Sequence, residues 1–219
     1  MFTLAEENYL KAIFHLEHEF QGEVSTNAIA ESMETKPSSV TDMIQKLAEK
    51  KLLTYKRYKG VQLTAEGKKV AANVIRKHRL WEVFLVEKLS FHWDQVHEIA
   101  EQLEHIQSEE LIIRLDKFLG SPEFDPHGDP IPDKHGVLKR TEKKLLSEID
   151  KNQKGVCVGV KESSPEFLQY LDKKKISIGT KIRVLGKEFF DGSMIIQVGS
   201  EQFFISHKIA ENLYVQTQE

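Results

Sequence analysis

The sequence has little cysteine and no long hydrophobic segment. Cys157 is the one cysteine among 219 residues, so no disulfide can form within the chain, which favours a reducing compartment such as the cytoplasm. No apolar run approaches the roughly 18 residues that a membrane span needs, and residues 1–20 lack the basic region and cleavage site of a signal peptide. The composition, 40% hydrophobic and 30% charged, is that of a globular protein with one to three domains. These absences predict a cytoplasmic protein with no membrane partner.

Charge is nearly balanced, at a net −3, but it is distributed unevenly along the chain. Residues 1–35 carry a net charge of −6, residues 36–79 carry +9, residues 80–140 carry −7 and residues 141–219 carry +1. A local basic surface is the electrostatic footprint of a protein that binds a polyanion, whatever its total charge. The basic block therefore predicts contact with nucleic acid, and the acidic blocks could hold cations.

Helices and one hairpin are predicted in the first third of the chain. Apolar residues at helical spacing predict a helix over residues 5–20, a short helix over TNAIAESM and a third helix that begins near Pro37. The β-prone residues 53–58 and 61–64 flank a glycine and are typical of a hairpin. Helix, short helix, turn, helix and hairpin is the order of a winged helix-turn-helix. The basic block falls on the recognition helix and the hairpin, the two elements that would touch DNA.

The rest of the chain changes character at about residue 155. Residues 68–89 predict one long helix, residues 94–119 predict one or two more, and a proline-rich loop follows, GSPEFDPHGDPIPDKHG. From residue 155, short β-prone runs surround one helix, SPEFLQYLDKK, which is typical of a small SH3-like barrel. The predicted fold class is mainly α with a small β part. Its predicted parts are a winged helix-turn-helix (1–72), a helical domain (73–140), a linker (141–154) with a short helix over 141–149, and an SH3-like domain (155–219).

The stretch VHEIAEQLEH gathers imidazoles and carboxylates on one side of a predicted helix. Four of its side chains fall within an arc of about 100°: His97, Glu101, Glu104 and His105. A second pair, His78 and Glu82, lies at i, i+4 on the preceding long helix. Such a ligand set suits Mn²⁺, Fe²⁺ or Zn²⁺, but the solvated face of an ordinary amphipathic helix would have the same pattern. The zinc-protease sequence HExxH is absent, because Glu101 stands where its second histidine would be.

Four segments resemble the diphtheria-toxin-repressor family of metal-dependent transcriptional repressors: PSSVTDMIQKLAEKKLLTYKRYKGVQLTAEGKKVA, RKHRLWEVFL, VHEIAEQLEH and PHGDPIP. The resemblance covers essentially the whole chain, the recognition helix is most similar to the manganese-type members, and the tail is similar to the family's SH3-like, iron-transport-accessory-type domain. It implies a repressor, not an enzyme, that binds double-stranded operator DNA as a homodimer when loaded with Mn²⁺ or alternatively Fe²⁺. It also implies control of metal-ion uptake genes, with Zn²⁺, Co²⁺, Ni²⁺ or Cd²⁺ as surrogate ions.

The resemblance places one metal site between the first helix and the VHEIAEQLEH helix. Carried over by position, its ligands would be Asn8, Glu101, Glu104 and His105. Asn8 departs from the Asp or Met of other members, and an amide oxygen is a weaker ligand than a carboxylate. Glu101 stands where iron-responsive members have Cys, and a carboxylate suits Mn²⁺ better than it suits metals that prefer thiolate.

A second metal site is implied on the long helix. It would use His78, Glu82 and His97, with remaining ligands from the SH3-like domain. Glu166 is the favoured candidate there and Glu162 the next. Asp125 and His127 of the proline-rich loop are alternatives, because some family members use the PHG segment.

The expected mechanism is a metal clip between two parts of each subunit. The ion would join the first helix, through Asn8, to the helical metal-binding and dimerisation domain (73–140), and so set the spacing of two recognition helices in the homodimer. Base contacts are expected at the start of the recognition helix, from Ser38, Ser39, Thr41 and Asp42. Phosphate contacts are expected from Lys36, Lys46, Lys56, Arg57 and Lys59.

Two other classes of function would use parts of the same sequence. A metal-dependent hydrolase could use the histidine and glutamate cluster with Glu98 as a general base, but it would leave the basic winged element unexplained. A metal-independent winged-helix regulator, or a transporter accessory module suggested by the tail, would leave the same cluster as an ordinary helix surface. Operator binding with and without metal separates the three.

Overall fold

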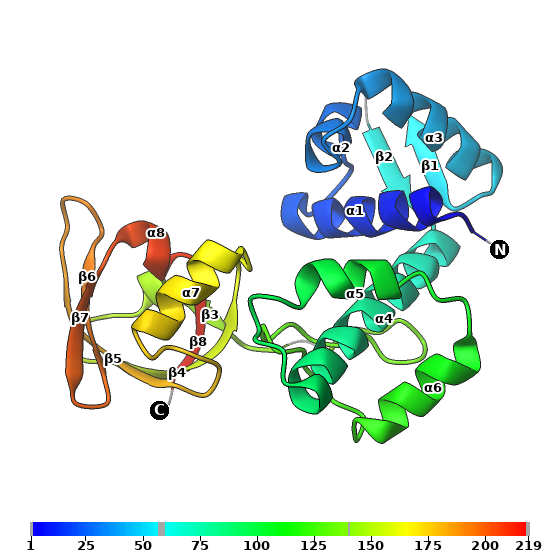
Figure 1. Ribbon diagram of the computed structural model, residues 1–219. Coiled ribbons are helices and arrows are strands. Elements are labelled where there is room, and N and C mark those ends of the chain that lie inside the picture. The colour runs from blue at the N-terminus through cyan, green and yellow to red at the C-terminus, as the bar shows by residue number, and fades with distance from the viewer. Residues whose placement is uncertain (1, 57–59, 140, 218–219) are drawn as a thin grey trace. The chain divides into compact units, whose positions relative to one another are not determined.

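The structure is a computed structural model of the chain and describes residues 2–56, 60–139 and 141–217 (Figure 1). Arg57 and Lys59, two of the predicted phosphate contacts, lie outside the described residues. The residues divide into two compact units, one of residues 1–81, 101–114 and 131–138 and one of residues 82–100, 115–130 and 139–219. No helix in the described ranges is both long enough and apolar enough to span a membrane.

The first unit contains the predicted winged helix-turn-helix. Its elements are α1 (Leu4–Phe20), α2 (Thr26–Ser32), α3 (Pro37–Glu49), β1 (Leu53–Lys56) and β2 (Gly60–Leu63). Helix α1 starts after Thr3, because the Thr3 hydroxyl accepts a hydrogen bond from the Glu6 N–H and the Glu6 carboxylate accepts one from the Thr3 N–H. Ser25 caps α2 through the Ala28 N–H, as its position predicts.

A short pairing between Val24 and β2 fixes the wing to the helices. The backbone N–H and carbonyl groups of Val24 and Val61 exchange two hydrogen bonds, of 2.9 and 2.8 Å. Gly60 has φ +117, and a Cβ at this position would lie 2.7 Å from the Val24 carbonyl oxygen, so only glycine fits. Helices α1, α2 and α3 share a core of fully buried side chains: Leu10, Ile13, Ile29, Val40, Ile44 and Leu47. This core holds the recognition helix α3 in place.

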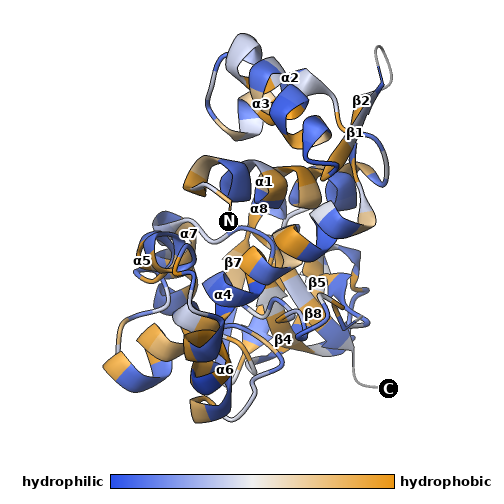
Figure 2. Cartoon of the chain, turned by 90° about the vertical axis from the view of Figure 1, so that its right-hand side faces the viewer, coloured by the Kyte–Doolittle hydropathy of each residue, from blue (hydrophilic) through white to orange (hydrophobic). Residues whose placement is uncertain are grey.

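Three further helices follow, as the helical spacing predicts: α4 (Ala65–Leu89), α5 (His97–Leu103) and α6 (Glu109–Phe118). Helix α4 begins after Thr64, whose hydroxyl accepts a hydrogen bond from the Gly67 N–H at 3.1 Å. Figure 2 shows that α6 carries both hydrophobic and hydrophilic residues. Three of its apolar side chains are exposed to solvent: Leu111, Ile113 and Phe118.

The second unit contains a six-stranded antiparallel sheet in the order β3-β8-β4-β5-β6-β7. The strands are β3 (Lys144–Leu145), β4 (Lys154–Val160), β5 (Lys181–Lys187), β6 (Met194–Val198), β7 (Glu201–Ile205) and β8 (Leu213–Thr217), and the helices are α7 (Pro165–Lys173) and α8 (His207–Ala210). The arrangement is compatible with the predicted SH3-like domain. The sheet is not a closed barrel in the described residues, because its end strands β3 and β7 do not pair.

The helix predicted over residues 141–149 is wrong. In its place are the short strand β3 and a single 3₁₀ turn, η1 (Leu146–Glu148). Lys144 and Leu145 pair with β8, which takes their backbone groups into the sheet. Leu146 and Ile149 are buried in the core of the sheet domain. The apolar residues that gave the helical spacing therefore fill the core from a turn.

Candidate metal centres

Helix α1 brings Glu7, rather than Asn8, to the predicted ligand His105. The Nδ1 atom of His105 lies 2.6 Å from Glu7 Oε2, and the Gln107 amide donates to Glu7 Oε1 at 3.2 Å. The Glu7 side chain is 5% exposed. Asn8 is half-buried, and its side chain forms no hydrogen bond or ion pair with the residues that the structure describes. In the described residues the contact of α1 with His105 is therefore made by Glu7, and the role of Asn8 as a ligand stays a prediction.

Glu104 lies at the centre of this cluster and is fully buried. His78 Nδ1 lies 2.7 Å from Glu104 Oε2, and Lys11 Nζ lies 2.7 Å from Glu104 Oε1. Lys11 also reaches Glu101 Oε1, at 3.3 Å. Burial alone would raise the pKa of Glu104, but His78 and Lys11 outweigh it and hold this pKa below its usual value. We call the residues Glu7, Lys11, His78, Glu101, Glu104 and His105 the first cluster.

The first cluster carries its own positive charges. Lys77 is buried, with Nζ 3.7 Å from Glu7 Oε1. Its burial lowers the pKa of the ammonium group, and the charges of Glu7 and Glu104 partly oppose this. Periodicity did not reveal Lys11 and Lys77, because a lysine on a helix is usually a solvated charge. The available signal was that Lys11 follows Glu7 by one turn of α1 and so shares its face.

A second cluster forms around Glu82 of α4. Glu82, Asp125 and His127 are all buried, and each offers a ligand atom within 4.8 Å of the others. His127 Nδ1 lies 3.6 Å from Glu82 Oε2, and His127 Nε2 donates to the Trp93 carbonyl oxygen at 2.9 Å. A backbone acceptor on one ring nitrogen leaves the other nitrogen to face the carboxylates, as in many metal-binding histidines. The two alternatives from the proline-rich loop, Asp125 and His127, are thus brought together.

The electrostatics of the second cluster suit a cation. Burial alone would lower the pKa of His127, but the hydrogen bond and charge of Glu82, with the charge of Asp125, raise it to about 9. The protonated imidazole therefore balances the two carboxylates in the metal-free chain. Asp125 is held in turn by the N–H groups of His127 and Asp129, at 2.8 and 3.0 Å.

Gly128 fixes the loop that positions His127. Its φ is +86, and a Cβ would lie 2.1 Å from the Val158 carbonyl oxygen, so the loop can approach β4 only through a glycine. The neighbouring His127 carbonyl accepts a hydrogen bond from the Val160 N–H at 3.0 Å. The segment PHG is therefore docked on the first strand after η1, β4.

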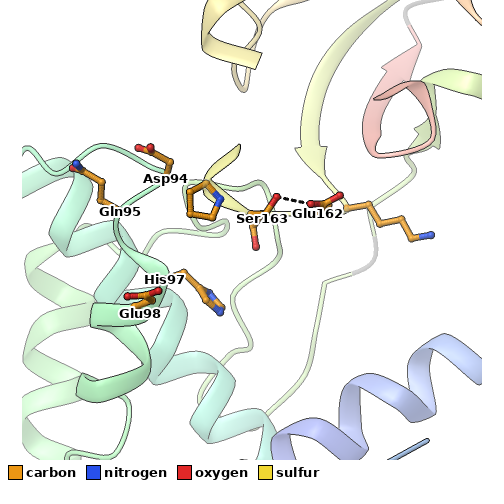
Figure 3. A pocket seen from close by; sticks show the side chains of 9 residues that line it. Asp94, Gln95, His97, Glu98, Glu162 and Ser163 are labelled. Atoms are coloured by element: carbon orange, nitrogen blue, oxygen red, sulfur yellow. Dashed lines mark hydrogen bonds between the residues drawn. The ribbon is translucent and has the colours of Figure 1, made fainter. Parts of the chain in front are cut away.

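His97 and Glu162 line one pocket of about 570 Å³ (Figure 3). His97 Nδ1 also lies 3.5 Å from Glu82 Oε1, so this histidine borders the second cluster. Glu162 accepts a hydrogen bond from the Ser164 hydroxyl. The favoured candidate Glu166 is exposed on α7 and is not among the residues that line the pocket. His78 lies one turn before Glu82 on the continuous helix α4.

The predicted DNA contacts that the structure describes are all exposed: Lys36, Ser38, Ser39, Thr41, Asp42, Lys46 and Lys56. Lys36 precedes α3 as its N-cap residue and makes no side-chain cap. Thr41 donates its hydroxyl proton to the Pro37 carbonyl at 3.0 Å, and Lys46 Nζ lies 3.1 Å from the buried Glu6 carboxylate. Base-contact candidates thus occupy the start of α3, whereas Lys46 is already engaged near its end.

A basic winged helix-turn-helix, together with helices that gather carboxylates and imidazoles, defines a class of protein: the metal-sensing, DNA-binding regulators. Comparison with known families agrees. Residues 1–61 match the family described as "Iron dependent repressor, N-terminal DNA binding domain" and residues 64–133 match "Iron dependent repressor, metal binding and dimerisation domain". Residues 144–217 match "FeoA domain".

Relatives and solved structures give the same result. The chain is 30% identical to the diphtheria toxin repressor of Corynebacterium jeikeium, over 81% of this chain and 75% of that protein. It is 31% identical to the HTH-type transcriptional regulator MntR of Oceanobacillus iheyensis, over 68% of this chain and 99% of that protein. A solved "Manganese-dependent transcriptional repressor complex with manganese" is 33% identical, with a TM-score of 0.88 over 97% of this chain and 100% of that one. ScaR with bound Cd²⁺ is also 33% identical, with a TM-score of 0.81 over 96% and 98%.

The chain belongs to the iron-dependent repressor family and is a metal-dependent transcriptional repressor. The resemblance noted in the sequence is therefore confirmed. The family consists of metal-dependent, DNA-binding repressors, so membership in it argues against the two alternative functions, a hydrolase and a metal-independent regulator.

Proposed function

We propose that this repressor responds to Mn²⁺, with Fe²⁺ as the alternative ion, and controls genes of metal-ion uptake from the cytoplasm. The observation that carries the proposal is the buried cluster of Glu82, Asp125 and His127, a set of oxygen and nitrogen donors in a chain with the fold of a manganese-dependent repressor. Carboxylate and imidazole donors are those that Mn²⁺ and Fe²⁺ accept. Zn²⁺, Co²⁺, Ni²⁺ and Cd²⁺ would act as surrogates.

The one thiol supports a hard ion. Cys157 is buried in β4, and this burial raises the pKa of its thiol to about 11. A thiolate, the form that binds metals, is therefore scarce at neutral pH. Soft metal ions therefore lack the thiolate ligand that they prefer. The carboxylates of both clusters favour hard ions such as Mn²⁺ instead.

The two clusters correspond to two proposed metal sites. The second cluster would bind through Glu82, Asp125, His127 and His97, with His78 one turn away on α4 and Glu162, rather than Glu166, as the ligand from the C-terminal domain. The first cluster would bind through Glu101, Glu104 and His105, with Glu7 or Asn8 from α1. A bound divalent ion would supply the positive charge that several buried carboxylates share.

The residues of the first cluster link α1 to the segment after α5. Glu7 and Lys11 of α1 already contact His105 and Glu104, so a change in the cluster acts directly on the first helix of the winged motif. Helix α1 in turn holds α3, because the buried Glu6 carboxylate accepts a hydrogen bond from Lys50 and forms an ion pair with Lys46. We propose that this path orients the recognition helix α3. Metal binding would then shift the population of molecules toward the orientation that fits the operator.

Operator DNA and a second copy of the chain are the proposed partners. The exposed start of α3 would reach base edges, and the surrounding lysines would contact phosphates. A symmetric dimer would present two such helices to half-sites one helical turn apart. The exposed apolar residues Leu111, Ile113 and Phe118 of α6 offer a surface that a second copy could cover.

The test is DNA binding as a function of metal. Duplexes are selected from a random library with the full chain and Mn²⁺, and fluorescence anisotropy then measures binding of the selected duplex. We expect Mn²⁺ or Fe²⁺ to strengthen binding at least tenfold over a chelator control and analytical ultracentrifugation to detect a dimer. Equal affinity in chelator and in Mn²⁺ would contradict the proposal. As a matched control, Glu188→Gln changes an exposed carboxylate outside both clusters and should leave the metal response intact.

A further inference from the structure

Lys11 lies where the cation of the first cluster would bind. Its Nζ atom is 2.7 Å from Glu104 Oε1 and 3.3 Å from Glu101 Oε1. The same Glu104 oxygen faces His105 Nε2 at 3.6 Å. Three proposed ligands therefore converge on one place, and an ammonium group from α1 occupies it.

An ammonium group and a divalent ion cannot share these oxygens without cost. Both would lie within about 4 Å of each other, and charges of +2 and +1 at that distance repel enough to weaken binding more than tenfold, even in water. Lys11 is only 16% exposed, whereas Glu104 is fully buried and needs a cation to offset its desolvation. The lysine stem is flexible, so the ammonium group can swing away when the carboxylates take another partner.

We propose that Lys11 is an internal competitor of the metal at Glu101 and Glu104, which sets the ion concentration at which the first cluster fills. This inference rests on the proposed function. In the second cluster, His127 Nδ1 faces Glu82 Oε2 at 3.6 Å, and Asp125 lies within 4.8 Å of both. At the first cluster, the incoming ion must displace the tethered ammonium group of Lys11 from Glu101 and Glu104. The second cluster should fill first, and the first cluster should fill only at a higher concentration of Mn²⁺.

The alternative is a structural salt bridge with no effect on metal binding. Under that reading, removal of the ammonium group destabilises the fold, because the buried Oε1 atom of Glu104 loses its ion pair with Lys11. The affinity for Mn²⁺ at the first cluster is then unchanged or weaker. Under the proposal, the same change makes the site more negative and free for the ion. The sign of the change in metal affinity separates the two readings.

The experiment measures Mn²⁺ binding to the full chain by the electron paramagnetic resonance signal of the free ion. Lys11→Gln should leave the tighter class of sites unchanged and tighten the weaker class about tenfold. Lys11→Met, which keeps the apolar stem, should have the same effect and guards against a folding defect specific to one variant. Lys68→Gln is the matched control, because Lys68 pairs with another buried carboxylate of α1, Glu17, at 3.1 Å and outside both clusters.

The outcomes separate this inference from the function on which it rests. If wild-type protein binds no Mn²⁺, the proposed function fails. If wild-type protein binds Mn²⁺ in two classes and both folded Lys11 variants bind with unchanged or weaker affinity, the competitor role is overturned and the repressor function stands. An equal tightening in Lys68→Gln would also overturn it, because the effect would then come from net charge alone.

Discussion

Replacing Glu6 by glutamine should lower the stability of the winged motif at neutral pH. Glu6 is fully buried, and its carboxylate accepts hydrogen bonds from Lys50 Nζ at 2.7 Å and the Thr3 N–H at 3.0 Å, with Lys46 Nζ at 3.1 Å. Burial alone would raise the pKa of Glu6. The two ammonium groups and the Thr3 N–H outweigh it and lower this pKa from 4.5 to about 2.

The expected loss of stability follows from the pKa difference of Glu6 between the folded and unfolded states. A pKa shift of one unit is worth about 1.4 kcal/mol, so a pKa of about 2 in place of 4.5 corresponds to roughly 3.5 kcal/mol. The side chains of Lys46 and Lys50 are 50% and 38% exposed, and water screens their charges, so we expect about 1–3 kcal/mol. Because the pKa is lower in the folded state, this stabilisation is fully present above about pH 4.5 and is lost as the pH falls toward 2.

Urea denaturation followed by circular dichroism measures the effect for wild type and Glu6→Gln from pH 7 down to the lowest pH at which both fold. The gap in unfolding free energy should be widest at pH 7 and should narrow below about pH 4.5. Glu110→Gln serves as the control, because its ion pair with Arg114 is exposed and worth less than about 0.5 kcal/mol. A gap that stays constant with pH would refute the reasoning, because the loss would then be one of packing.

Three further changes test the sites. Gly128→Ala forces a Cβ to within 2.1 Å of the Val158 carbonyl at φ +86, so we expect a loss of more than about 2 kcal/mol and weaker Mn²⁺ binding; an unchanged melting temperature would argue against it. Glu82→Gln removes the group that most raises the pKa of His127, so the metal-free pKa should fall from about 9 toward its usual range in an NMR titration; a value still near 9 would exclude Glu82 as the cause. Lys46→Gln should reduce the slope of log affinity for the operator against log salt concentration by about one if Lys46 contacts a phosphate. An unchanged slope would show that Lys46 pairs with Glu6 and does not contact DNA.

The order of elements could be predicted because local signals agreed with tertiary packing. Helix α1 has a capping box and a regular apolar face, and the wing has β-prone strands around Gly60. The segment 141–149 had the same helical spacing without such support. Its first residues pair with β8, and that long-range pairing decided the outcome.

The site was predicted less completely, for a geometric reason. Glu7 and Asn8 are neighbours on α1, about 100° apart around the helix axis. Which one meets His105 depends on how α1 rotates on its core, and spacing along the sequence does not contain that angle. Lys11 was missed for a different reason, because a lysine on a helix is usually a solvated charge. Glu162 lies in the segment before α7, whereas Glu166 lies in the first turn of that helix, and only the structure shows that Glu162 lines the pocket with His97.

The chemistry of the buried thiol has a consequence for oxidative stress. Peroxide attacks thiolates, and a sensor that binds its ion through cysteine loses both ion and response when the sulfur is oxidised. Here the sulfur of Cys157 lies inside a strand, and the candidate ligands are carboxylates, imidazoles and an amide. Such a repressor would keep reporting the abundance of its ion in a cell under oxidant attack, when a thiolate-based switch would already have released its genes.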